Sequence, residues 1–269
     1  MGIISEMLSY PFMVRALIGG LLVSLCASLL GVSLVLKRYS MIGDGLSHVS
    51  FGSLSIALAA GWSPLKVSIP VAFFLLRITE HGKVKSDAAI AMISASALAI
   101  GIIVTSLTTG MTTDVSSYMF GSILAMSRED VQFAAVLSMV VLGLYLFCYN
   151  KVFAVTFDES FAKATGVNVS LYNVLIAVLT AITIVIGMRM MGAMLISSLI
   201  IFPALTSMRV FKSFRGVVIA SGILSLICFF GGMVLSYTYS TPAGASVVVV
   251  DLAAFLLFSL IQRGIAVRK

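Results

Sequence analysis

Residues 12–36 read FMVRALIGGLLVSLCASLLGVSLVL, and Arg15 is the only charged side chain in this run. About 20 apolar residues in a helix cross the hydrocarbon core of a membrane, so the run predicts a transmembrane helix that is long enough to tilt. Eight more apolar runs follow it, at 43–60, 64–77, 87–108, 131–149, 171–187, 190–208, 216–237 and 245–262. The sequence therefore predicts an all-α polytopic membrane protein with about nine transmembrane helices, in a range of about eight to ten. The 64–77 run is short and contains Pro70, so we expect it to kink or to cross only part of the membrane.

The composition excludes the soluble classes of protein. Of 269 residues, 60% are hydrophobic and 10% are charged, and the mean hydropathy is +1.16. Soluble domains carry about 25% charged residues, so this chain is neither an ordinary soluble enzyme nor a disordered chain. The net charge of +7 does not indicate a nucleic-acid partner, because basic residues on a membrane protein report its orientation. We expect residues 1–269 to form a single transmembrane domain in the lipid bilayer.

The basic residues predict the orientation of the chain. With the amino terminus outside and the carboxyl terminus inside, 13 of the 17 Lys and Arg residues fall in inner segments and 4 fall in outer ones. Cytoplasmic segments of membrane proteins carry the excess of Lys and Arg. A miscount of one span would remove this bias, so the bias also supports an odd number of spans.

Two connections are unusually long. Residues 109–130 lie outside in this topology and contain a short apolar stretch, for which we expect a helix at the membrane interface. Residues 150–170 lie inside, and there Asp158 and Glu159 begin a short amphipathic pattern that Gly166 ends. Acids at the start and a glycine at the end are typical of a helix. This helix is either a solvated connector or a docking element for a cytosolic partner.

Asp44 and His48 are the candidate metal ligands. A charged side chain inside a membrane costs about 2.5–3.5 kcal/mol on insertion scales, so its presence requires a reason. The two residues are four positions apart and share one face of a helix, with Ser47 beside them. Together they supply part of a divalent-cation site, and the remaining ligands have to come from other helices, from water or from a second copy of the chain. Two alternatives stay open: an internal Asp–His pair that locks helix packing, and a proton relay, because histidine titrates near neutral pH.

Asp251 is the other acid inside a predicted span, and it either takes part in helix packing or lines the transport pathway. The three cysteines are isolated in apolar runs and form no CxxC motif, so we expect them to pack in the core rather than form disulfides or a metal cage. These are Cys26, Cys148 and Cys228. His81 belongs to a basic inner loop, where we expect it to be solvated.

No GxxxxGK[ST] phosphate loop occurs in the sequence, and no HExxH or GxSxG motif. We therefore expect a transport subunit and not an enzyme, so that a separate polypeptide hydrolyses the nucleotide if nucleotide drives transport. The alternative is a stand-alone cation transporter or channel that is driven by an ion gradient and uses the same Asp–His pair.

Five stretches resemble one family in the order in which they occur. They read KRYSMIGDGLSH at 37–48, YMFGSILAMS at 118–127, FDESFAKATGV at 157–167, MGAMLISSLIIFPA at 191–204 and TPAGA at 241–245. These stretches are similar to the permease subunits of prokaryotic ABC transporters for divalent metals, the zinc, manganese and iron (ABC-3) group. Asp251 departs from the aliphatic residue that we expect there, and Gly45 and Val49 stand where alanine is common.

The resemblance implies a permease fold like that of type II ABC importers, in a prokaryotic inner membrane. It implies three kinds of partner: two cytosolic ABC ATPases, an extracytoplasmic metal-binding protein, and a second permease, which is either another copy or a sister chain. It implies that Asp44 and His48 line the path of a transported Mn, Zn or Fe ion and that no cofactor is permanently bound. It also implies that residues 157–166 form a coupling helix for the ATPase, with contributions from Phe157, Asp158, Glu159, Ala162 and Gly166.

Overall fold

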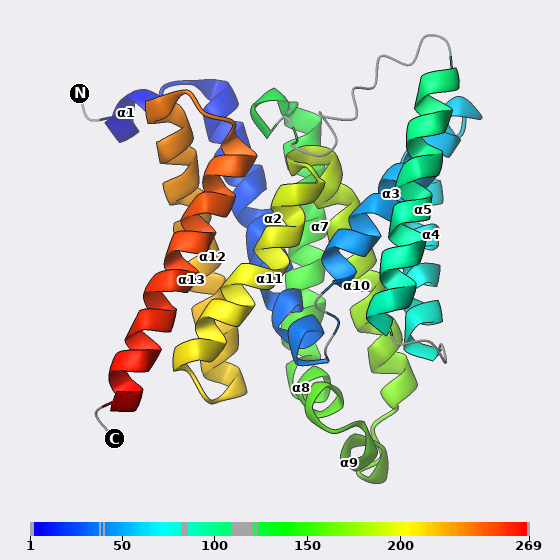
Figure 1. Ribbon diagram of the computed structural model, residues 1–269, viewed down its shortest axis with the longest axis vertical. Coiled ribbons are helices and arrows are strands. Elements are labelled where there is room, and N and C mark those ends of the chain that lie inside the picture. Colours follow the sequence, from blue (N-terminus) through cyan, green and yellow to red (C-terminus); the bar gives the residue numbers. More distant parts are fainter. Residues whose placement is uncertain are drawn as a thin grey trace.

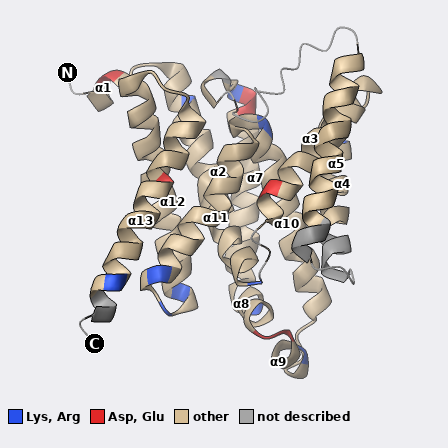
Figure 2. Cartoon of the chain, viewed as in Figure 1, with Lys and Arg blue, Asp and Glu red and all other residues tan. Residues whose placement is uncertain are grey.

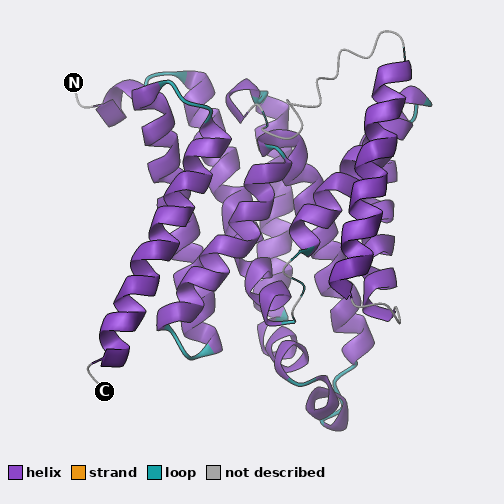
Figure 3. Ribbon diagram, viewed as in Figure 1, coloured by secondary structure: helices purple, strands orange, loops and turns teal. Residues whose placement is uncertain are grey.

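Each of the nine predicted spans coincides with a helix in the computed structural model, which describes residues 3–37, 39, 41–81, 86–108, 121 and 123–267 (Figure 1). The long helices are α2 (Pro11–Leu36), α3 (Ile42–Ala59), α4 (Pro64–His81), α5 (Ser86–Leu107), α7 (Arg128–Phe147), α10 (Val169–Met191), α11 (Ala193–Val210), α12 (Phe214–Tyr239) and α13 (Ala243–Val267). The short ones are α1 (Ile3–Met7), the 3-10 turn η1 (Ile123–Ala125), α8 (Tyr149–Phe157) and α9 (Glu159–Ala164). Within these ranges the chain has no strand (Figure 3), so the predicted all-α class is confirmed.

Seven of the described helices are long and apolar enough to cross a membrane by length and composition. The other two long helices are α3 and α4. α3 carries Asp44, His48 and several serines among its apolar residues, and the apolar part of α4 covers only Pro64–Leu75. Pro70 lies inside α4 without ending it. The helix that carries the candidate metal ligands is therefore one of the two long helices that fall short of this limit.

The central helix is α2, which packs against α7, α10, α11 and α12. Two serines of α12 hold it: Ser221 and Ser225 donate hydrogen bonds of 3.2 and 3.0 Å to the backbone carbonyl oxygens of Ser28 and Ser24. Small residues allow membrane helices to approach closely, and their hydroxyl groups then bond across the contact. α3, α4 and α5 pack together at one edge of the bundle, and α12 and α13 lie at the other (Figure 1).

We expect Gly31 to be the most sensitive position in the contact between α2 and α11. A Cβ atom added there would lie 2.0 Å from the carbonyl oxygen of Ile200, which is backbone and cannot turn aside. Gly31→Ala should lower the stability of the protein in detergent by about 1–3 kcal/mol, the usual cost of overpacking. Gly143→Ala is the matched control, because nothing lies within 4 Å of the added atom, and alanine is the better helix former by about 1 kcal/mol. Equal melting temperatures for the two variants would contradict this close contact.

Most of the charged residues coloured in Figure 2 lie at the two ends of the bundle, and two acidic positions lie near its middle. Most of the Lys and Arg residues lie at the end that holds α8, α9 and the connection between α11 and α12, and the two chain termini lie at opposite ends (Figures 1 and 2). This arrangement agrees with an odd number of crossings.

Several predicted features have a clear outcome, and others lie outside the described residues. All three cysteines are free, and Cys26 and Cys228 are buried, as core packing requires. Residues 109–120 and 122, which make up most of the predicted interfacial helix and part of the 118–127 stretch, lie outside the described part of the chain. The side chain of His81 lies outside it as well, and the single-domain organisation of residues 1–269 stays a prediction.

Candidate functional site

Asp44 and His48 lie on adjacent turns at the start of α3. The Oδ1 atom of Asp44 is 3.5 Å from Nε2 of His48, and the Asp44 side chain is 50% exposed while that of His48 is 17% exposed. Asp44 is in the first turn of α3, where the helix dipole favours a negative charge. The carboxylate is therefore stabilised by the helix and accessible from outside the chain.

The separation of these two atoms fits a shared metal ion. Oxygen and nitrogen ligands lie about 2.0–2.2 Å from a zinc-like ion, so two ligands at a tetrahedral angle are about 3.4 Å apart. Among the residues that the structure describes, no group of three or more His, Cys, Asp or Glu side chains could hold a metal ion. If the pair holds an ion, the described part of one chain would supply two ligands of this kind.

Ser47 is turned away from the pair and into the bundle. It is fully buried, donates a hydrogen bond of 2.8 Å to the carbonyl oxygen of Gly43, and lies 3.5 Å from the hydroxyl of Ser197 in α11. Gly52, on the next turns of the same helix, is buried against the backbone of Ala97 in α5. The helix α3 is therefore exposed at Asp44 and covered by α5 at Gly52.

Asp251 lies in a different part of the bundle. Its helix, α13, packs against α11 and α12, whereas α3 packs against α4, α5, α10 and α11. The carboxyl group is 2% exposed and contacts the thiol of Cys228 in α12, and its Oδ2 atom has no hydrogen-bond partner. The structure does not bring Asp251 together with Asp44 and His48.

The predicted helix within residues 158–166 is present as α9. The Asp158 carboxylate accepts a hydrogen bond of 2.9 Å from the backbone N–H of Phe161 and caps the start of the helix. Gly166 ends it with a φ of +81°, a left-handed conformation that glycine adopts without steric cost. Ala162 is completely buried in a small core with Val155 and Val167, so these residues give the segment its shape.

The outward face of this segment is aromatic. Phe157 and Phe161 are 61% and 63% exposed, at the end of the bundle where the basic residues gather. Exposed aromatic side chains outside the lipid are typical of a protein-binding surface. Phe161 lies within the predicted coupling segment 157–166 but was not among the residues predicted to contribute, and its exposure depends on the packing of α9, which the sequence does not specify.

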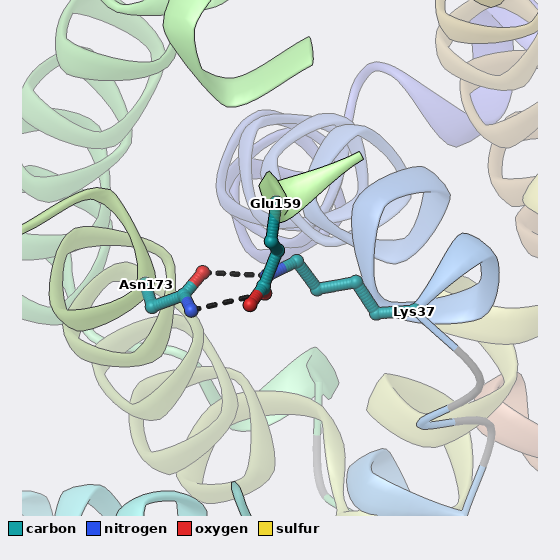
Figure 4. A network of polar contacts seen from close by, with 3 residues as sticks. All are labelled: Lys37, Glu159 and Asn173. Atoms are coloured by element: carbon teal, nitrogen blue, oxygen red, sulfur yellow. Dashed lines mark hydrogen bonds and ion pairs between the residues drawn. The ribbon is translucent and has the colours of Figure 1, made fainter. Parts of the chain in front are cut away.

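Glu159 is about half exposed and takes part in a network with Lys37 and Asn173 (Figure 4). The Nζ atom of Lys37, the residue that caps the end of α2, lies 2.9 Å from Oε1 of Glu159 and donates a second bond to Oδ1 of Asn173 in α10. Asn173 in turn donates a bond of 3.1 Å to Oε1 of Glu159. The three residues join the end of α2, α9 and the start of α10.

This network should weaken only in acid. Burial of the Glu159 carboxyl raises its pKa, but the hydrogen bonds from Lys37 and Asn173 and the charge of Lys37 outweigh burial and leave the pKa below its ordinary value of 4.5. A lowered pKa stabilises the folded state at every pH above the unfolded pKa, and this stabilisation is lost as the pH falls through the folded pKa. Hydrogen–deuterium exchange of α9, corrected for intrinsic rates, should be constant from about pH 6 to 8 and should rise below about pH 4. Glu159→Gln should already show faster exchange at neutral pH, and exchange equal to wild type there would contradict the role of the ion pair.

At the opposite end of the bundle, Arg189 pairs with Asp130. Its Nη2 atom lies 3.5 Å from Oδ1 of Asp130, which also forms a capping box with Ser127 at the start of α7. The pair joins the ends of α7 and α10 on the predicted outer side.

Comparison with known proteins supports the expected family. The sequence model of the ABC 3 transport family matches residues 9–262. The chain belongs to the ABC 3 transport family. As a member, it is a multi-pass membrane subunit of an ABC transporter and not the ATPase.

Curated relatives of this ABC 3 permease match it along nearly its whole length. The zinc uptake membrane protein ZnuB of Haemophilus influenzae is 27% identical over 258 residues, which are 94% of this chain and 98% of ZnuB. A protein of the same organism named as a probable iron transport system membrane protein is 30% identical and covers 98% of both chains. Among solved structures, PsaBC from Streptococcus pneumoniae in complex with Fab superposes with a TM-score of 0.88 at 27% identity and covers 99% of both chains. The permease fold like that of ABC importers is thus confirmed.

Proposed function

We propose that this ABC 3 permease carries divalent transition-metal ions, Mn²⁺, Zn²⁺ or Fe²⁺, into the cytoplasm as part of an ATP-driven importer. The observation that supports this proposal most directly is the Asp44–His48 pair, with 3.5 Å between its ligand atoms on a helix that has no other ionisable residue. A carboxylate with an imidazole suits these three ions better than Cu(I), which prefers sulfur ligands. Relatives named for zinc and for iron fit the same range of cargo.

The open side of Asp44 supports a site that is completed from outside the chain. A second permease, identical or a sister chain, or water would supply the remaining ligands. An incomplete site also suits transport, because an ion that moves through has to bind weakly enough to leave. The roles of Ser47 and Asp251 along the path stay predictions.

The end of the bundle with α8 and α9 is proposed to face the cytoplasm, with the carboxyl terminus on the same side and the amino terminus outside, in a prokaryotic inner membrane. The excess of basic residues at that end supports this orientation. The segment 157–166 would dock one of two ABC ATPases there through Phe157 and Phe161. A metal-binding protein would deliver the ion at the opposite end, and the ion is cargo, so no resident cofactor is needed.

Reconstitution tests this proposal against its alternative. The chain is placed in liposomes with its ATPase and binding protein, and uptake of radiolabelled manganese, zinc and iron is measured with and without ATP. We expect uptake that requires ATP and both partners. Transport by the purified chain alone, driven by an ion gradient without ATP, would instead support a stand-alone transporter or channel.

A further inference from the structure

Lys37 is a largely buried cation at the boundary between two functional segments. Its side chain is 10% exposed, whereas that of its partner Glu159 is 54% exposed. A buried ammonium group requires partners, because removal from water costs several kcal/mol per ion. Lys37 has two, Glu159 in α9 and Asn173 in α10, and all three members bond to one another (Figure 4). The network is therefore closed, and a movement of α9 changes the environment of Lys37 directly.

The chain leads from Lys37 to the metal ligands through a short, hydrogen-bonded connection. The backbone N–H groups of Lys37 and Tyr39 donate to the carbonyl oxygens of Ser33 and Leu34, and that of Ile42 donates to Tyr39. α3 begins at Ile42, and Asp44 is in its first turn. Tyr39 is thus bonded both to the end of α2 and to the first residue of α3, so it links a displacement at Lys37 to the start of α3.

α9 packs on α8 and α10. Its residue Ala162 forms a small core with Val155 and Val167, separate from the main core, and residues of α10 pack against this core. The ion pair between Glu159 and Lys37 ties α9 to the end of α2. Charge-assisted hydrogen bonds of this kind are stronger and more directional than neutral ones.

We propose that the Lys37–Glu159–Asn173 network transmits the movement of α9 to the start of α3, and that Lys37 is a positioning residue for Asp44 and His48. This inference rests on the proposed function, in which the ATPase moves α9. When α9 shifts, Lys37 moves with the carboxylate of Glu159. The junction between α2 and α3 then rotates the start of α3, and Asp44 and His48 move with it. Phe157 and Phe161 take no part in this network. Transmission of the movement can therefore be tested separately from docking of the ATPase.

The test uses the complete transporter in liposomes and measures the metal transported per ATP hydrolysed. In Lys37→Met and in Asn173→Leu, the ATPase should stay bound and basal hydrolysis should continue, while this ratio falls by about tenfold, a typical allosteric coupling. The double variant should be no worse than either single one, because both changes break the same interaction. Lys37→Arg should retain most of the ratio, since a guanidinium also donates to both partners.

Lys212→Met is the matched control. Lys212 is exposed in the connection between α11 and α12 at the same end of the bundle, and its variant should keep the wild-type ratio. A wild-type ratio in Lys37→Met, additive losses in the double variant, or release of the ATPase from either single variant would overturn the inference. Failure of the proposed function gives a different result, because the wild-type transporter itself would then show no ATP-dependent metal uptake.

Discussion

Asp44→Asn is expected to abolish metal accumulation while the transporter stays assembled. The amide keeps the size of the carboxylate but removes the negative charge that replaces part of the hydration shell of the ion. His48→Ala removes the second ligand and should have the same effect. We expect uptake of radiolabelled metal to fall by about a hundredfold or more, beyond the 10- to 100-fold cost of losing a residue that only supports a ligand.

The control for this experiment is another acid of the same chain. Glu129 is an exposed residue in the first turn of α7, and Glu129→Gln should leave uptake unchanged. Co-purification of the ATPase with each variant verifies assembly. Normal uptake by both Asp44→Asn and His48→Ala would refute the metal-ligand role and leave the pair as a packing interaction.

Replacement of the two exposed phenylalanines should release the ATPase. Phe157 and Phe161 are more than half exposed, and aromatic side chains of this kind contribute about 2 kcal/mol or more when they are central to an interface. Phe157→Ser with Phe161→Ser should therefore weaken ATPase binding by at least about 30-fold for each residue. The measurement is co-purification of the ATPase, supported by loss of ATP-dependent uptake.

Phe211→Ser provides a matched aromatic control. Phe211 is 41% exposed in the connection between α11 and α12, outside the segment 157–166, and its variant should bind the ATPase normally. Full ATPase binding by the double variant would show that the docking surface lies elsewhere. Reversal of charge at Asp158 and Glu159 is a less specific experiment, because it removes the cap of α9 and its ion pair at once.

The helices of this protein could be predicted from the sequence because lipid imposes one dominant rule. A run such as 12–36 has to satisfy all its backbone hydrogen bonds internally, and a helix is the available solution. The helix at 159–164 followed from capping residues at its two ends, Asp158 and Gly166. The Asp44–His48 pair followed from helical spacing alone, since residues four apart lie on adjacent turns.

The tertiary partners could not be predicted in the same way. Lys37 and Glu159 are 122 positions apart, and no local pattern links them to Asn173. The coupling role of Glu159 stays a prediction, and its bonds to Lys37 and Asn173 are an addition that the sequence pattern does not predict. The contact between Asp251 and Cys228 depends on how α13 packs against α12, which periodicity does not specify.

The separate small core beneath α9 has a consequence for how such transporters diversify. Because Val155, Ala162 and Val167 form a core separate from the main one, we expect residues 155–167 to be transferable as a unit, whereas Val152 in the preceding turn of α8 belongs to the main core. Exchange of this segment between related permeases, together with a matching partner for Lys37, should change which ATPase binds and leave the Asp44–His48 pair unchanged. Related permeases could then work with different ATPases while their membrane-spanning helices stay unchanged.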